Sequence, residues 1–136
     1  MKFNSQICTT KEQSERLLAL GLKKETADMT LQTSLDVCFT MSFQDAIEYF
    51  EDRHLPPHPT ILPAWSLHRL IEMLNYQVIH NGKKYEPVIA IDGMAYQDVC
   101  NDGPIVGWSR DLYTDVIDCI EWLISIEQFN KEYLEE

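Results

Sequence analysis

The chain has 136 residues, of which 45% are hydrophobic, and its formal net charge is −11. This length and apolar content are typical of a packed domain that needs neither a metal nor a disulfide to fold, and they exclude a disordered chain. The negative charge, most of it in residues 51–136, disfavours direct binding to nucleic acid, and no apolar run approaches the roughly 18 residues of a membrane span.

The first predicted element is a helix that begins near residue 10. Thr9 with Glu12 and Thr10 with Gln13 both fit the spacing of a capping box, in which a hydroxyl caps an N–H and the later side chain reaches back. Leucines follow, and Gly21 can adopt the left-handed conformation that ends a helix.

The next segments predict a strand, a helix and a connector. Residues 23–34 are polar and irregular, whereas residues 35–40 alternate apolar and polar side chains, as in a half-buried strand. Ser42 can cap a helix whose apolar side chains recur on one face. The proline-rich residues 54–63 cannot propagate a helix and predict a semi-rigid connector.

The second half of the chain predicts a helix, a meander and a final helix. Ser66 caps the first of these, and Asn-Gly and Asp-Gly pairs at residues 81–82 and 92–93 suit two-residue hairpin turns. Pro87 belongs at an edge or bulge, and residues 111–129 form a largely apolar helix. We therefore expect one α+β domain over residues 1–136, with a three-to-four-stranded antiparallel meander packed against about four helices.

The cysteines and histidines predict no metal site and no cofactor. The cysteines are widely scattered, and residues 1–6 lack the blocks of a signal peptide, so we expect a cytoplasmic protein with reduced thiols at Cys8, Cys38, Cys100 and Cys119. His54 and His58 have the spacing of a metal pair, but the prolines between them exclude helical geometry. The carboxylates lack the spacing of a calcium-binding loop.

No motif for nucleophilic, nucleotide-binding or zinc-protease chemistry occurs in the chain, so no catalytic residue is assigned and an enzyme is disfavoured. Aromatic side chains and a carboxylate could line a ligand pocket between the meander and the Ser66 helix, or they could be core residues. The residues in question are Trp65, Tyr96, Asp98 and Trp108.

Several separated blocks of the sequence carry a resemblance to a known group of proteins. They are residues 7–22, 26–29, 63–67 and 115–123. These blocks resemble small uncharacterised proteins of Bacteroides-type gut bacteria, several of them encoded in prophages or other mobile elements. The resemblance implies a phage-like or mobile-element accessory protein, and it implies no catalytic residues.

Our leading functional hypothesis is a non-enzymatic module that binds another protein through an apolar patch framed by acidic charge and that can also self-associate; the acidic charge would suit a basic partner. The alternative is a small-molecule-binding or hydrolase-like domain that uses the aromatic pocket. A third hypothesis is an acidic mimic of nucleic acid, which needs carboxylates spaced like phosphates along one face.

Overall fold

The computed structural model describes residues 6–34, 36–53, 61–90, 92–100 and 103–136. Within these residues the chain is α+β, with four α-helices and two antiparallel sheets. It divides into two compact units, residues 1–69 with 133–136 (unit 1) and residues 70–132 (unit 2). The expectation of one domain over residues 1–136 stays a prediction.

Unit 1 holds the first three strands and the first two helices. Its elements are α1 (Lys11–Ala19), a 3-10 turn (Lys24–Thr26), β1 (Met29–Gln32), β2 (Val37–Phe39), α2 (Phe43–Asp52) and β3 (Ile61–Ala64), followed by the start of α3 (Leu67–Glu72). Thr10 is the N-cap of α1 and forms a complete capping box with Gln13. Gly21 follows the helix with φ = +99°, so both ends of α1 lie where the sequence predicts them.

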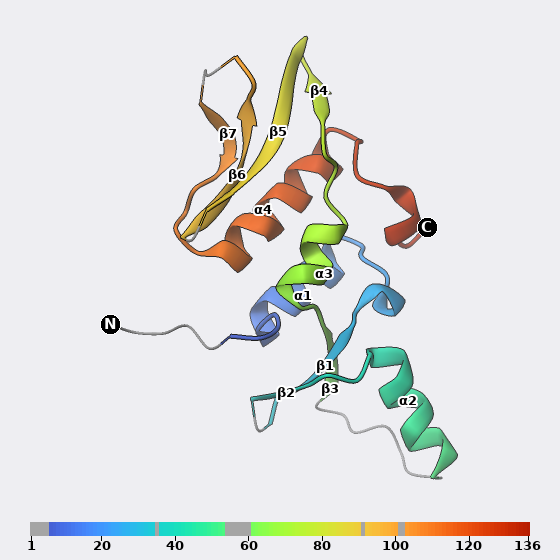
Figure 1. Cartoon of the computed structure of the whole chain (residues 1–136). Helices are drawn as coiled ribbons and strands as arrows, with labels where there is room; N and C mark the ends of the chain where they lie inside the picture. The colour runs from blue at the N-terminus through green and yellow to red at the C-terminus, as the bar shows by residue number, and fades with distance from the viewer. Residues whose placement is uncertain (1–5, 35, 54–60, 91, 101–102) are drawn as a thin grey trace. The chain divides into compact units, whose positions relative to one another are not determined.

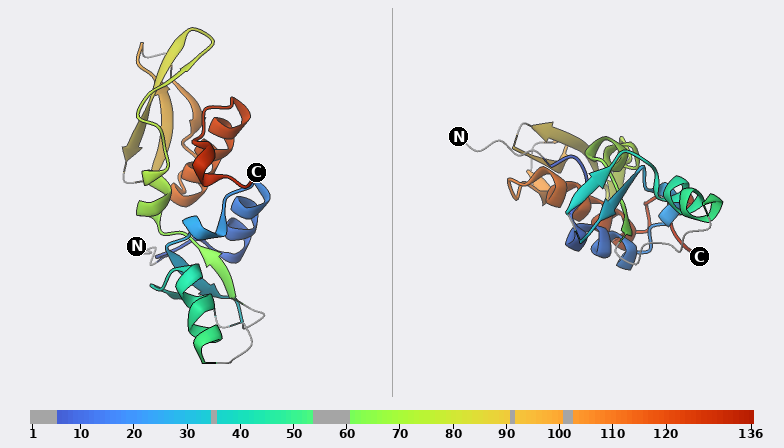
Figure 2. Two further views of the ribbon diagram at one scale, coloured as in Figure 1. Left: turned by 90° about the vertical axis from the view of Figure 1, so that its right-hand side faces the viewer. Right: turned by 90° about the horizontal axis from the view of Figure 1, so that it is seen from below.

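The three-stranded sheet of unit 1 has the order β2-β1-β3, and all its pairs are antiparallel. Thr30 pairs with Phe39 on one side and with Pro63 on the other. Because side chains alternate along a strand, Thr30 and Gln32 share one face with Val37 and Phe39. Figure 2 shows α2 beside these strands, and the opposite face packs its buried side chains, Met29, Leu31 and Ala64, on Cys8.

Two strands of this sheet correct the sequence-based expectation. β1 lies within residues 23–34, which we expected to be irregular, and β3 overlaps the expected connector; residues 54–60 of that connector lie outside the described residues. Pro63 is tolerated in β3 because β3 is an edge strand, where a missing N–H need not break a ladder. The fold therefore contains a second sheet in addition to the predicted meander.

Unit 2 is built on that meander, which has the order β4-β5-β6-β7 and antiparallel pairing throughout. Its elements are β4 (Val78–His80), β5 (Lys83–Ala90), β6 (Gly93–Asp98), β7 (Pro104–Gly107) and α4 (Leu112–Ser125). Pro87 pairs with Tyr96 of β6, beyond the stretch of β5 that pairs with β4, so it occupies a local edge as predicted.

Helix α4 lies along the sheet of unit 2 (Figure 1), and a buried carboxylate joins the two. Asp115 is fully buried and accepts hydrogen bonds from the backbone N–H groups of Met94 (3.0 Å) and Ser109 (2.8 Å). A Cβ on Gly93 would lie 2.7 Å from Asp115 Oδ2, so this position needs glycine. Packing of the other helices against the meander stays a prediction.

Unit 1 is made from two separate segments of the chain. Residues 133–136 return to it: the N–H of Lys23 donates to the carbonyl of Tyr133 (2.9 Å), and the N–H of Glu135 donates to the carbonyl of Gly21 (2.7 Å). The guanidinium of Arg69 lies 5.6 Å from the centre of the Tyr133 ring. Among the described residues, no helix is both long enough and apolar enough to cross a membrane.

Candidate functional site

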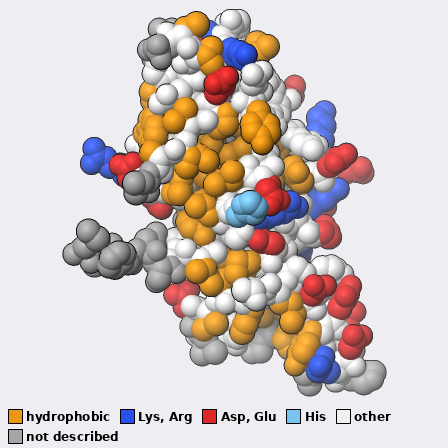
Figure 3. All heavy atoms as spheres, in the orientation of Figure 1, with side chains coloured by type: hydrophobic (Ala, Val, Ile, Leu, Met, Phe, Trp, Pro, Cys, Tyr) orange, Lys and Arg blue, Asp and Glu red, His pale blue; other side chains and the backbone are white. Residues whose placement is uncertain are grey.

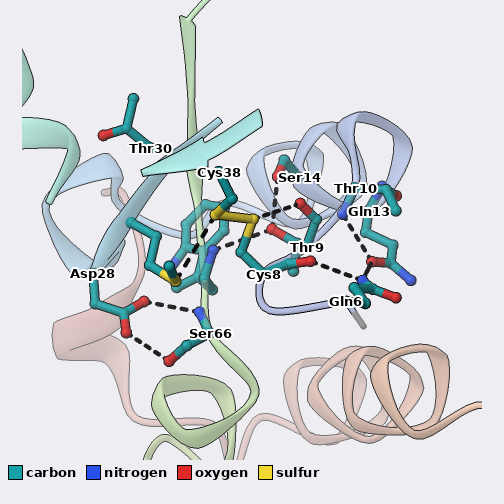
Figure 4. Close-up of a disulfide and its surroundings, with 12 residues drawn as sticks. Gln6, Cys8, Thr9, Thr10, Gln13, Ser14, Asp28, Thr30, Cys38 and Ser66 are labelled. Carbon is teal, nitrogen blue, oxygen red and sulfur yellow. Dashed lines mark hydrogen bonds between the residues drawn. A yellow bond between two sulfur atoms is a disulfide. The ribbon is translucent and has the colours of Figure 1, made fainter. Parts of the chain in front are cut away.

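A disulfide between Cys8 and Cys38 lies in unit 1 (Figure 4), and it corrects the prediction of reduced thiols for this pair. The two residues are 30 positions apart, but the β1–β2 pairing turns Cys38 to the face of the sheet that packs on Cys8. Cys119 and Cys100 are free cysteines, of which Cys119 is buried and Cys100 is exposed. Disulfides are typical of oxidising compartments, so the cytoplasmic location stays a prediction that this bond does not favour.

Buried polar groups hold the segment that follows Cys8 in place. The Thr9 hydroxyl lies 2.7 Å from the Ser14 hydroxyl and accepts a hydrogen bond from the backbone N–H of Trp65 (3.1 Å). The N–H of Thr9 in turn donates to the carbonyl of Trp65 (2.9 Å), and the Trp65 indole donates to the Thr26 hydroxyl (3.0 Å). Of the two capping boxes that the sequence allows, Thr10 forms the real one, and Thr9 instead joins α1 to the end of β3 (Figure 4).

An apolar hollow of about 460 Å³ opens between α2 and the sheet face that carries Thr30 and Gln32. We call it the α2 hollow. Its lining is mostly large and apolar, and three of these side chains are at least 40% exposed: Phe39, Met41 and Tyr49. The remaining lining residues are Thr30, Gln32, Thr40, Ala46, Phe50 and Ile61. Exposed aromatic and methionine side chains around a hollow are typical of protein-binding surfaces.

Carboxylates border the α2 hollow on the helix side. Helix α2 carries Asp45, Glu48, Glu51 and Asp52 and has no lysine or arginine. Helical spacing places Asp45 and Asp52 beside Tyr49, at i−4 and i+3. Arg53, which follows the helix, lies 3.7 Å from the centre of the Tyr49 ring. In Figure 3, acidic side chains (red) and apolar side chains (orange) lie together over α2.

A second hollow, of about 550 Å³, lies beside the disulfide on the other face of the same sheet. We call it the disulfide hollow. Leu31, Val37 and Cys38 belong to it from the sheet, and Ile7, which is 56% exposed, belongs to it from the segment before α1. Asp36, directly before β2, also lines it. The edge strand β2 therefore has a hollow on each side of the sheet.

The sequence did not predict the α2 hollow. The alternation over residues 35–40 correctly predicts a strand, but we expected its apolar side chains to face the core, whereas Val37 and Phe39 are 40% and 45% exposed. The apolar face of α2 was visible from its spacing, with Phe43 and Ala46 buried as expected. Tyr49, one position from that face, was the available signal that the apolar surface continues toward solvent.

The four residues proposed as a ligand pocket are divided between the units. Trp65 belongs to unit 1, and Tyr96, Asp98 and Trp108 belong to unit 2. Trp65 and Tyr96 are fully buried, and the Tyr96 hydroxyl donates to the carbonyl of Asn75 (2.8 Å). Trp108 is half-buried. The role of these residues as ligand contacts stays a prediction.

Asp98 has structural partners on two sides. Its carboxylate accepts a hydrogen bond from the backbone N–H of Cys100 (2.9 Å), as expected for a residue that supports a turn. It also lies 3.8 Å from the ammonium of Lys83. The carboxylate is 4% exposed, and these contacts hold it at the end of β6.

The buried cysteine of unit 2 is poorly suited to nucleophilic chemistry. Burial raises the pKa of the Cys119 thiol from its ordinary value near 9 to about 12, and the carboxylates of Asp115 and Asp118 add to this increase. Burial also raises the pKa of the neighbouring Tyr96 above its usual value. Because the thiolate is the reactive form of cysteine, Cys119 stays protonated and inert at neutral pH.

Within the described part of the chain, no group of three or more His, Cys, Asp or Glu side chains could hold a metal ion. His54 and His58 lie outside the described residues. In comparisons with known proteins, no family model, curated protein or solved structure matches the chain.

Proposed function

We propose that this chain is a non-enzymatic protein-interaction module whose partner docks in the α2 hollow. The observation that carries the proposal is a hollow with Phe39, Met41 and Tyr49 exposed along it and carboxylates on its border. Leaving such side chains in water is unfavourable, at roughly 25 cal/mol for each Å² of apolar surface, and a docked protein would remove that surface from water. Aromatic and methionine side chains are also the residues that anchor protein interfaces.

The border of the hollow favours a partner with basic side chains. Asp45 and Asp52 lie beside Tyr49 at this border, and α2 itself carries no lysine or arginine. These carboxylates repel phosphate groups, so we propose a protein partner and not a nucleic acid. A second copy of this chain would bring the same carboxylates, which makes self-association through this surface the weaker alternative.

The biological setting that we propose comes from the sequence resemblance alone: a phage-like or mobile-element accessory protein. The alternative of a small-molecule-binding or hydrolase-like domain gains no support from three of its four candidate residues, because Trp65, Tyr96 and Asp98 are buried and hydrogen-bonded within the fold.

Affinity capture from a bacterial lysate, compared between three variants, tests the proposal. We expect a stoichiometric protein partner for the wild-type chain at low salt, a recovery about tenfold lower for Tyr49→Ala, and unchanged recovery for Tyr76→Ala. Tyr76 is a matched control because it is an exposed tyrosine (90%) that belongs to unit 2. Equal capture by Tyr49→Ala and wild type, or recovery of small molecules alone, would contradict the proposal.

A further inference from the structure

We propose that the partner binds as an extended, basic peptide segment that adds a fourth strand to the outer edge of β2. This inference rests on the proposed function and specifies its ligand. Three features carry it: the open edge of β2, the hollows on both faces beside that edge, and the charge of α2.

The first feature is the edge itself. β2 pairs only with β1 among the described strands, so its other side is a sheet edge. Alternate residues of an edge strand turn their N–H and C=O groups away from the sheet, where another chain can bind them. Protein edges are commonly protected by short length, charged side chains or proline. β2 is short, with three residues, but its sequence Val-Cys-Phe carries neither a charge nor a proline.

The second feature is the pair of hollows. Phe39 lies on the face of the α2 hollow, and Cys38 lies on the face of the disulfide hollow. Side chains of an added strand would alternate between these two faces. Every second residue would therefore meet apolar surface in the α2 hollow, and the residues between would meet the more polar disulfide hollow, where Asp36 lies. This period of two fits an extended peptide and does not fit a docked helix.

The disulfide gives this edge a fixed form. It ties Cys38, the middle residue of β2, to Cys8. The residue after Cys8, Thr9, is in turn held to Trp65 by hydrogen bonds (Figure 4). An edge that is already ordered loses little conformational entropy when a peptide binds. The ligand then gains main-chain hydrogen bonds along β2 and side-chain contacts in the two hollows.

The third feature is charge, which selects among extended peptides. Asp45 and Asp52 flank Tyr49 at the border of the α2 hollow, and Asp36 lines the disulfide hollow. Arg53, directly after α2, lies over the Tyr49 ring. A peptide with lysine or arginine among its apolar residues would place positive charge beside these carboxylates. The same carboxylates oppose pairing of β2 with β2 of a second copy.

The probe for the test is a displayed library of random octapeptides, selected on the wild-type protein under oxidising conditions. We expect enriched sequences to alternate β-branched or aromatic residues with others and to contain lysine or arginine. One enriched peptide is then synthesised in two isomeric forms, each N-methylated at one of the two alternating sets of amides. Only one set faces β2, so one isomer should lose about tenfold or more in affinity, whereas the other should bind like the parent peptide.

Two further measurements separate this inference from the proposed function. The Asp45→Asn/Asp52→Asn variant should bind the peptide more weakly and with less dependence on salt, while its circular dichroism spectrum stays unchanged. Peptides that bind as helices, or that tolerate both N-methylation patterns, would overturn strand addition, although loss of binding in Tyr49→Ala would still support the α2 hollow. Failure to enrich any peptide, or a dimer that forms through β2, would overturn the inference, and the capture experiment would then decide the proposed function on its own.

Discussion

Reduction of the Cys8–Cys38 disulfide should destabilise unit 1 by an amount that its loop length sets. The bond closes a loop between residues 30 positions apart. In the chain-entropy model, a cross-link of this span removes enough freedom from the unfolded chain to stabilise the folded state by about 3.6 kcal/mol at room temperature. That is a substantial part of the roughly 5–15 kcal/mol by which a domain is stable.

Urea denaturation of the Cys100→Ser protein, with and without a phosphine reductant, measures this effect. Cys100 is replaced because its exposed thiol would form bonds between molecules during oxidation. Hydrogen exchange, read by mass spectrometry, should show faster opening in peptides that cover β1 and β2 after reduction. Peptides from β5 and β6 of unit 2 should be much less affected. A Cys8→Ala/Cys38→Ala version of the same protein is the control and should not respond to the reductant.

Two results would refute this reasoning. Equal free energies of unfolding before and after reduction, with thiol titration showing that the bond was broken, would mean that the cross-link does not restrict the unfolded chain as the model requires. Four free thiols in the wild-type protein after oxidative refolding would mean that Cys8 and Cys38 do not pair.

Three further predictions concern unit 2. Asp115→Asn should lower the free energy of unfolding by about 3 kcal/mol in urea denaturation, because an amide cannot accept both backbone N–H groups that the carboxylate binds. Gly107→Ala should cost more than about 2 kcal/mol in the same assay, because φ is +107° and the new Cβ would meet the Met94 carbonyl; Gly82→Ala, with φ = +76° and open space around it, should cost only about 1 kcal/mol. The free energy of unfolding should decrease as pH rises from about 9 toward 12, because the unfolded chain releases the Cys119 proton in that range while the folded chain retains it. The decrease should be smaller in Cys119→Ala. An equal pH dependence in both proteins would contradict the raised pKa of Cys119.

The elements that could be predicted from the sequence are those specified by local interactions. The capping box of Thr10 and the serine cap at Ser42 depend on residues within one turn of the chain. The turn at residues 81–82 depends on Asn81 and Gly82, which both have a positive φ as expected. These features need no knowledge of the rest of the fold, which is why they were correct. The expected turn at residues 92–93 was wrong in detail, because Gly93 has no positive φ and instead begins β6, where it pairs with Ala90.

The features that were missed depend on contacts between distant residues. β1 and β3 have four residues each and lie in polar or proline-rich surroundings, so their pairing, not their composition, makes them strands. The disulfide arises because the pairing of β1 with β2 turns Cys38 toward Cys8. The α2 hollow was missed for a related reason: periodicity shows that a helix has an apolar face, but it cannot show how much of that face another element covers.

The return of residues 133–136 to unit 1 has a consequence for biosynthesis. Unit 2 is continuous in sequence and can fold as soon as it leaves the ribosome, whereas unit 1 still lacks the backbone hydrogen bonds that Lys23 and Gly21 make to that last segment. The N-terminal unit is therefore completed after the unit that follows it, against the usual vectorial order of domain folding during translation. Until then the backbone groups of residues 21–23 lack these partners, which lie more than 100 positions downstream in the chain.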